Sequence, residues 1–161
     1  MIYLGIDPGL FGSVGVITDY STAVFDTPTT KIKKGKTTKN QYLPSEMASI
    51  LLRFKGDDVH VVIEAIHAMP KQGVTSSFNF GVGYGLWLGI LAAYEIPHTK
   101  VTPQAWKKQI MKGCTDKDAS RIRAAELFPG LSSQFAKKKD DGRAESMLMA
   151  QYCKNLFNKK D

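Results

Sequence analysis

Hydrophobic and polar positions change their period along the chain, and these changes divide it into short segments. Apolar runs rich in β-branched residues predict five strands, at Ile2–Asp7, Gly12–Thr18, Ala23–Asp26, Val59–Glu64 and Pro97–Val101. Apolar residues three or four apart predict five helices, at Pro44–Lys55, Thr75–Tyr94, Pro103–Met111, Asp116–Phe128 and Asp141–Phe157. This order predicts an α/β fold in which a mixed sheet is covered by helices on its faces.

Three features of these segments are less regular. The lysine-rich stretch Thr27–Asn40 has no hydrophobic period, which predicts a mobile loop or an extended hairpin. The helix at Thr75–Tyr94 contains several glycines, which are costly in a helix interior but allow close approach to a sheet or another helix. The helix before the last is expected to be capped by Thr115 or Asp116 and to end at the following Pro-Gly pair.

Length and composition predict one globular domain spanning residues 1–161. Cys114 and Cys153 lie far apart, outside any Cys/His cluster, so neither a disulfide scaffold nor a zinc site is expected. The first residues resemble neither a signal peptide nor a transit peptide, and the longest apolar stretch is too short for a bilayer. We therefore expect no membrane association and a cytoplasmic location, in a bacterium or a phage-infected cell.

The formal net charge is +7, and its distribution is uneven. Residues 100–160 carry fourteen Lys and Arg against six Asp and Glu, and residues 31–39 add five lysines without an acid. A basic surface of this kind suits nucleic acid. Charge alone favours this interpretation no more than simple solubility.

Four acidic residues occur where one metal site needs them. Asp7 and Glu64 each end a hydrophobic strand, and Asp141 and Glu145 are one turn apart at the start of the last helix. Clustered carboxylates need a divalent cation, and Mg²⁺ prefers carboxylate oxygens and phosphate. Taken singly, Asp7 can be a turn residue and Asp141 a helix cap.

The sequence around these acids resembles the RuvC-type Holliday junction resolvases, most closely their chloroplast and phage branch. The resemblance rests on three motifs in the right order, Gly5-Ile6-Asp7-Pro8-Gly9 with Gly12–Ile17, then Val62-Ile63-Glu64, then Asp141–Leu148. The first motif alone also opens actin-like ATPases, but 161 residues are too few for their two lobes. The resemblance implies a ribonuclease-H-like fold with a mixed five-stranded sheet flanked by helices.

By this resemblance, Asp7, Glu64, Asp141 and Glu145 bind two Mg²⁺ ions, and Mn²⁺ substitutes. Two ions clamp a phosphodiester during hydrolysis. Bacterial resolvases place the last two acids three residues apart and use Asp at both, whereas here they are four apart. Asp140 is therefore an alternative ligand to Asp141.

The resemblance also implies residues for catalysis and for DNA contact. Lys117 and Lys108 match lysines near the scissile phosphate, where positive charge offsets developing negative charge. Each is also explained as a solvated helix lysine. The expected DNA contacts lie after the second acidic motif, in the lysine-rich segment and before and within the last helix: His67, Met69, Lys71, Lys33, Lys34, Lys36, Lys137, Lys138, Lys139 and Arg143.

The aromatic residues of Thr75–Tyr94 are Phe78, Phe80, Tyr84 and Trp87, which resemble a dimer-forming helix of the family. A homodimer matches the two-fold symmetry of a four-way junction. The sequence thus predicts a homodimeric, Mg²⁺-dependent endodeoxyribonuclease that resolves four-way DNA junctions by symmetric cuts. The alternatives are a broader nuclease for branched DNA or RNA/DNA hybrids and a non-catalytic junction-binding protein.

Overall fold

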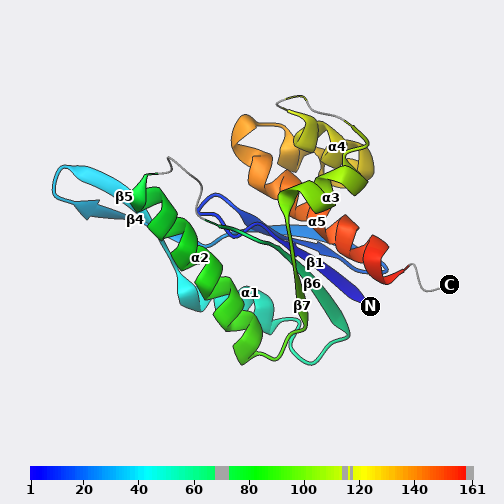
Figure 1. Cartoon of the computed structure of the whole chain (residues 1–161), viewed down its shortest axis with the longest axis horizontal. Helices are drawn as coiled ribbons and strands as arrows, with labels where there is room; N and C mark the ends of the chain where they lie inside the picture. The colour runs from blue at the N-terminus through cyan, green and yellow to red at the C-terminus, as the bar shows by residue number, and fades with distance from the viewer. Residues whose placement is uncertain (68–72, 114–115, 117, 159–161) are drawn as a thin grey trace.

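The computed structural model describes residues 1–67, 73–113, 116 and 118–158, without the side chain of Lys34. Within these residues, five strands form one mixed sheet in the order β3-β2-β1-β6-β7 (Figure 1). The strands are β1 (Ile2–Ile6), β2 (Ser13–Ile17), β3 (Thr22–Asp26), β6 (Val59–Glu64) and β7 (His98–Val101). Strand β1 pairs antiparallel with β2 and parallel with β6, so the predicted mixed sheet is confirmed.

Helices cover both faces of this sheet, as the hydrophobic pattern predicts (Figure 1). The helices are α1 (Pro44–Leu52), α2 (Val74–Ala93), α3 (Pro103–Ile110), α4 (Ala119–Leu127) and α5 (Asp141–Phe157). Alternation along β1 and β6 sends Tyr3 and Val62 into the core under α3, α4 and α5. The neighbours Leu4 and Ile63 enter the core under α1 and α2. Strands β1 and β6 therefore each contribute side chains to two separate hydrophobic cores.

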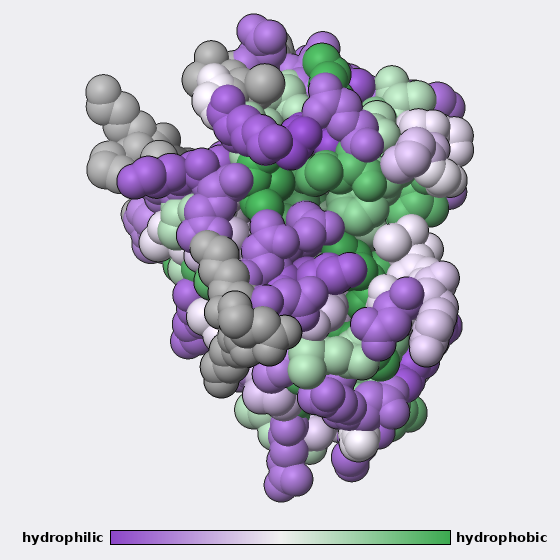
Figure 2. All heavy atoms as spheres, turned by 90° about the vertical axis from the view of Figure 1, so that its right-hand side faces the viewer, coloured by the Kyte–Doolittle hydropathy of each residue, from purple (hydrophilic) through white to green (hydrophobic). Residues whose placement is uncertain are grey.

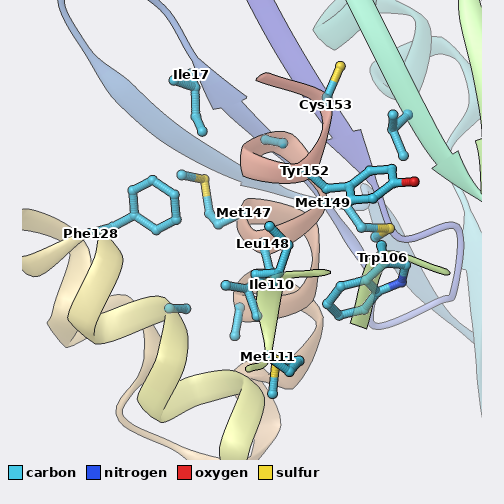
Figure 3. Close-up of a cluster of buried hydrophobic side chains, with 14 of the residues drawn as sticks. Ile17, Trp106, Ile110, Met111, Phe128, Met147, Leu148, Met149, Tyr152 and Cys153 are labelled. Atoms are coloured by element: carbon cyan, nitrogen blue, oxygen red, sulfur yellow. The ribbon is translucent and has the colours of Figure 1, made fainter. Parts of the chain in front are cut away.

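Helix α5 lies directly on the sheet because glycines line its path. A side chain on Gly5 would overlap the backbone of Ser146, and one on Gly15 would place its Cβ 2.6 Å from the same backbone. Figure 3 shows the layer around α5, where Met147 and Leu148 pack with residues of the neighbouring helices such as Trp106. This close packing determines the distance between α5 and the strands.

The lysine-rich segment forms a hairpin of β4 (Thr29–Lys34) and β5 (Thr37–Tyr42). It is separate from the main sheet and projects from the side of the molecule opposite the chain ends (Figure 1). The expectation of an extended hairpin is thus confirmed. Its base is anchored, because Tyr42 is buried and its hydroxyl donates to the Pro8 carbonyl at 3.4 Å.

The segment before α4 differs from the prediction. Helix α4 begins at Ala119, with Asp118 before it, so Asp116 does not cap it; Thr115 lies outside the described residues. Positive φ angles at Lys112 and Gly113 turn the chain after α3 and delay the start of the helix. Two short 3-10 helices, Pro129–Phe135 and Lys138–Asp140, then lead into α5 and are too short for the periodicity to reveal.

The surface reflects the same layering. Figure 2 shows the face at the right of Figure 1, where hydrophilic side chains dominate and hydrophobic ones form a band across the middle. In the described part of the chain, no helix has both the length and the apolar character needed to cross a membrane.

Candidate active site

Two acidic residues extend the parallel strands β1 and β6 at the same edge of the sheet. Ile6 pairs with Ile63, so Asp7 and Glu64 follow at adjacent positions. Alternation places both side chains on the face that α5 covers, since Gly5 and Val62 lie under that helix. The parallel register of β1 and β6, together with the alternation along each strand, thus brings these two carboxylates together.

The start of α5 is held against the turn between β1 and β2. Buried Ser13 Oγ donates to the Gly142 carbonyl at 2.9 Å and shares a 2.7 Å hydrogen bond with Ser146 Oγ. Gly142 has no room for a side chain, because a Cβ would overlap the Phe11 carbonyl. This anchor brings the first turn of α5 to the strand ends.

A cavity of about 570 Å³ opens where these elements meet. Asp7, Asp141 and Glu145 line it together with Lys138 and Lys139. It therefore combines three of the four predicted acids with two of the predicted DNA-binding lysines.

The carboxylates repel one another. The pKa of Asp7 is raised to about 7, mainly by burial and also by the charges of Glu145 and Glu64, against the opposing effects of the Gly9 amide and Lys107. Burial also raises the pKa of Glu64, to which Glu145 adds, while a hydrogen bond from Trp106 and the charge of Lys107 lower it. Excess negative charge is thus concentrated at this end of the sheet.

Internal donors partly neutralise that charge, and the sequence did not single them out. Lys107 Nζ lies 3.0 Å from Glu145 Oε1, and Trp106 Nε1 donates to Glu64 Oε1 at 2.9 Å. Arg121 Nε donates to Asp141 Oδ1 at 2.8 Å. The four predicted acids belong to one site, but three of them are directed at donors from α3 and α4.

The donor set fits a hard divalent cation, since all four side chains offer carboxylate oxygens and the raised pKa of Asp7 indicates uncompensated charge. Among the described residues, however, no three His, Cys, Asp or Glu side chains are arranged to hold an ion. The ion pair with Lys107 is one reason, because it directs the Glu145 carboxylate toward α3. The chemistry of the site therefore suits Mg²⁺.

Helical phase explains why Lys107, and not Lys108, faces the acids. Trp106 and Ile110 are buried and define the inner face of α3. Lys107 flanks this face, while Lys108 is turned about 100° further away and is exposed. The hydrophobic pattern of α3 already indicated this inner face. A catalytic role for Lys108 stays a prediction.

Asp140 and Asp141 occupy different environments. Asp140 is buried, and its Oδ2 accepts the Lys137 amide at 2.8 Å. Asp141 is half-exposed and lines the cavity. This arrangement favours Asp141 as the ligand. Arg143, expected to contact DNA, donates two 2.6 Å hydrogen bonds to Asp26 and thereby ties α5 to β3.

The remaining predicted contacts fall into two groups. The exposed residues lie after β6, in the hairpin and before α5: His67, Lys33, Lys36, Lys137, Lys138 and Lys139. Met69, Lys71 and Lys117 lie outside the described residues, as does the side chain of Lys34.

The aromatic residues of α2 do not form one surface. Trp87 is fully buried against the sheet, whereas Phe78 is 70% exposed. Phe80 precedes the buried pair Trp87 and Leu91 by seven and eleven residues, so it continues their face of the helix beyond the sheet edge. It lines the cavity and is 41% exposed. Sequence spacing did not distinguish these roles.

Comparison with solved structures identifies the architecture. The chain resembles a Thermus thermophilus RuvC structure with a TM-score of 0.55 and 16% identity, over 97% of each chain. It resembles T. thermophilus RuvC in complex with Holliday junction substrate with a TM-score of 0.58 and 13% identity, over 98% of this chain and 96% of that one. The chain has the ribonuclease-H-like fold of RuvC.

A curated relative extends this likeness to the sequence. Holliday junction resolvase MOC1, chloroplastic, from Chlamydomonas reinhardtii is 30% identical over 89 residues, which are 55% of this chain. The match covers 10% of that relative, so the chain spans a small part of its length. No family model matches the chain. The predicted resemblance to RuvC and to the chloroplast resolvases is confirmed.

Proposed function

We propose that the chain is a metal-dependent endonuclease that cuts four-way DNA junctions. The observation that carries this proposal is the cluster of Asp7, Glu64 and Glu145 on a RuvC-like fold, in which the charge of Glu145 raises the pKa of both Asp7 and Glu64. Asp141 and two exposed lysines border the same cavity. Concentrated negative charge opposes phosphate binding unless a cation is present, so a purely DNA-binding surface gains nothing from it.

Asp7, Glu64, Asp141 and Glu145 would hold the metal, for which we propose two Mg²⁺ ions with Mn²⁺ as a substitute. When bound, the ions activate water and stabilise the leaving oxygen of a phosphodiester. Release of Lys107 from Glu145 leaves an ammonium group at the edge of the site. There it can neutralise a phosphate oxygen, the role that the resemblance gives to Lys108 and Lys117.

The DNA backbone would lie along two basic elements. The β4–β5 hairpin presents exposed Lys33 and Lys36 on one side of the site, and Lys138 and Lys139 stand at the cavity itself. Such contacts position DNA without reading its sequence. Contacts from His67, Met69 and Lys71 near the branch point stay predictions, as does a cytoplasmic location.

We propose that the protein acts as a homodimer formed through α2. Val74, Phe78 and Val82 are 87%, 70% and 37% exposed and succeed one another at four-residue spacing. Three glycines share this stripe, and a Cβ on any of them would meet nothing within 4 Å: Gly81, Gly85 and Gly89. The stripe is opposite the buried face of α2, so it offers a second copy an apolar surface with close backbone approach.

The dimer is tested by light scattering coupled to size exclusion. Replacing Val74, Phe78 and Val82 with Ser should give monomers with unchanged far-ultraviolet circular dichroism. A matched triple change at exposed positions of three other helices, Leu52→Ser in α1, Lys108→Ser in α3 and Ile122→Ser in α4, should leave the mass unchanged. A monomeric wild type, or a triple variant of unchanged mass, contradicts this interface.

The activity is tested with a labelled four-way junction beside linear duplex, an RNA/DNA hybrid and a flap. With Mg²⁺ we expect paired nicks near the branch point of the junction alone, and none with EDTA. Asn or Gln at any of the four acids should abolish cutting and leave junction binding largely intact. Normal cleavage by Asp7→Asn refutes the site. Cutting of every substrate favours a broader nuclease, and binding without cutting in any divalent metal favours a structural protein.

A further inference from the structure

The cavity beside the carboxylates is larger and less polar than a phosphate requires. Its volume of about 570 Å³ is in the range of pockets that enclose small organic groups. Four of its lining residues are largely apolar: Leu10, Phe11, Tyr42 and Phe80. A second ligand group with an apolar face therefore fits beside the scissile phosphate.

Phe11 is an exposed ring on a rigid support. Its side chain is 77% exposed, yet its carbonyl is packed so closely on Gly142 that no Cβ fits there. The adjacent Gly12 amide donates to the Gly9 carbonyl at 3.0 Å and closes the turn. The exposed ring contributes no burial to the free protein, and its anchored backbone lowers the entropy lost when a partner stacks on the ring.

Phe80 reaches the same cavity from the opposite element. Its Cε1 would lie 3.9 Å from a Cβ on Gly9, so the ring is beside the turn that carries Phe11. Asn79 lines the cavity next to Phe80 and offers an amide that both donates and accepts hydrogen bonds. The cavity thus combines two aromatic rings, a polar amide and lysines at its rim.

We propose that this cavity receives an unstacked nucleobase of the strand being cut, with Phe11 and Phe80 against its faces and Asn79 at its edge. Every base has a π-face, and stacking on aromatic side chains is a general way to hold a base out of a helix. The phosphate next to that base would then be directed toward the carboxylates. This inference rests on the proposed junction cleavage. It adds that efficient cleavage requires a base next to the phosphate that is cut.

The test combines abasic junctions with ring variants. Each base within two nucleotides of the cut is removed in turn, and cleavage is measured for wild type, Phe11→Ala and Phe80→Ala. At one position we expect removal of the base to slow cleavage by wild type about tenfold. Phe11→Ala and Phe80→Ala should cut the intact junction slowly, and removal of that base should not slow them further. Phe11→Tyr should restore base dependence and Phe11→Leu should not. Tyr20→Ala, at an aromatic residue that is 98% exposed between β2 and β3 and does not line the cavity, is the matched control.

A binding measurement separates the two proposals. With 2-aminopurine at the sensitive position and Ca²⁺ in place of Mg²⁺, junction binding should change its fluorescence in wild type but not in Phe11→Ala. Wild type that cuts junctions with no dependence on any base, or Ala variants with the base dependence of wild type, overturns the base subsite alone. Wild type that neither binds nor cuts junctions overturns the proposed function and the subsite with it.

Discussion

Lys107 Nζ lies 3.0 Å from Glu145 Oε1, and the same oxygen accepts a 3.3 Å hydrogen bond from Ser120 Oγ. Glu145 is one of the four proposed ligands, so an internal cation takes the place that a metal ion would need. The Lys107 side chain is 43% exposed and that of Glu145 24%, so the pair is partly screened by solvent. The pair can therefore open when an ion competes for the carboxylate.

Lys107→Gln should bind Mg²⁺ more tightly and cleave more slowly. The ion pair competes with Mg²⁺ for the carboxylate by roughly 0.2–1 kcal/mol, so its loss should lower the Kd for Mg²⁺ by about 1.4- to fivefold in calorimetry. Cleavage at saturating Mg²⁺ should fall, because the charge beside the phosphate is lost.

Lys108→Gln is the matched control for this change, since Lys108 is the exposed neighbour on the same helix. It should alter neither Mg²⁺ affinity nor cleavage rate by more than about twofold. A larger loss of cleavage in Lys108→Gln than in Lys107→Gln would assign the catalytic lysine to position 108.

Asp7→Asn should stabilise the metal-free protein at alkaline pH. The ordinary pKa of this carboxyl is 3.8, and in the folded protein it is about 7, so the folded state retains a proton that the unfolded chain loses. Stability from this group is complete below about pH 4, decreases as the pH rises toward 7 and stays low above it. At pH 8 the variant should unfold with a free energy higher by on the order of 2–4 kcal/mol.

Urea denaturation at pH 8 and pH 5 checks this sign. The difference between Asp7→Asn and wild type should shrink at pH 5, where wild-type Asp7 holds its proton. Mg²⁺ at pH 8 should stabilise wild type more than the variant. Equal stability of the two proteins at pH 8 without metal would show that Asp7 carries no buried charge.

Trp106→Phe should shift the pH dependence of cleavage. The indole N–H donates to Glu64 at 2.9 Å and lowers its pKa, so its loss raises the pKa of a proposed ligand. In the variant, Glu64 therefore ionises at a higher pH than in wild type. The acidic limb of the cleavage profile should move to higher pH, with activity recovered at alkaline pH.

Trp87→Phe provides a matched control on the other side of the sheet. Trp87 is also fully buried, and within the described residues its indole nitrogen has no hydrogen-bond partner. Both changes leave a similar void, but only the first removes a bond to a carboxylate. A shifted pH profile in both variants would indicate a general packing effect.

Substitution of the hairpin lysines should weaken junction binding and its salt dependence. Lys33 and Lys36 are exposed on the β4–β5 hairpin, and each phosphate contact contributes about 0.9 to the slope of log K against log salt. Replacing both with Gln should lower that slope by up to about 2 between 50 and 200 mM salt. Fluorescence anisotropy on a labelled junction measures it.

Lys55→Gln serves as the control, because its ammonium lies 5.5 Å from the Tyr94 ring, beside the C-terminal end of α2. It should leave the salt slope unchanged. An equal decrease with Lys55→Gln would mean that net charge, and not the hairpin, determines binding.

The sequence determined the elements and half of the site. Strands and helices have local periods, so α5 was predicted at its observed bounds, and Asp7 and Glu64 follow from two apolar strands of matching length. The pairing of Asp141 with Glu145 follows from helical spacing alone. The segment Thr27–Asn40 has no such period, so the hairpin was one of two alternatives.

Only the tertiary structure decided which side chains meet across elements. Lys107 faces the acids and Lys108 does not, because burial of Trp106 sets the rotation of α3. Phe80 reaches the cavity and Phe78 the open face, because packing on the sheet sets the rotation of α2. A helix repeats its own spacing whatever lies beside it. A local pattern can indicate which face of a helix is buried, but the side chains of other elements that this face meets depend on residues far away in the chain.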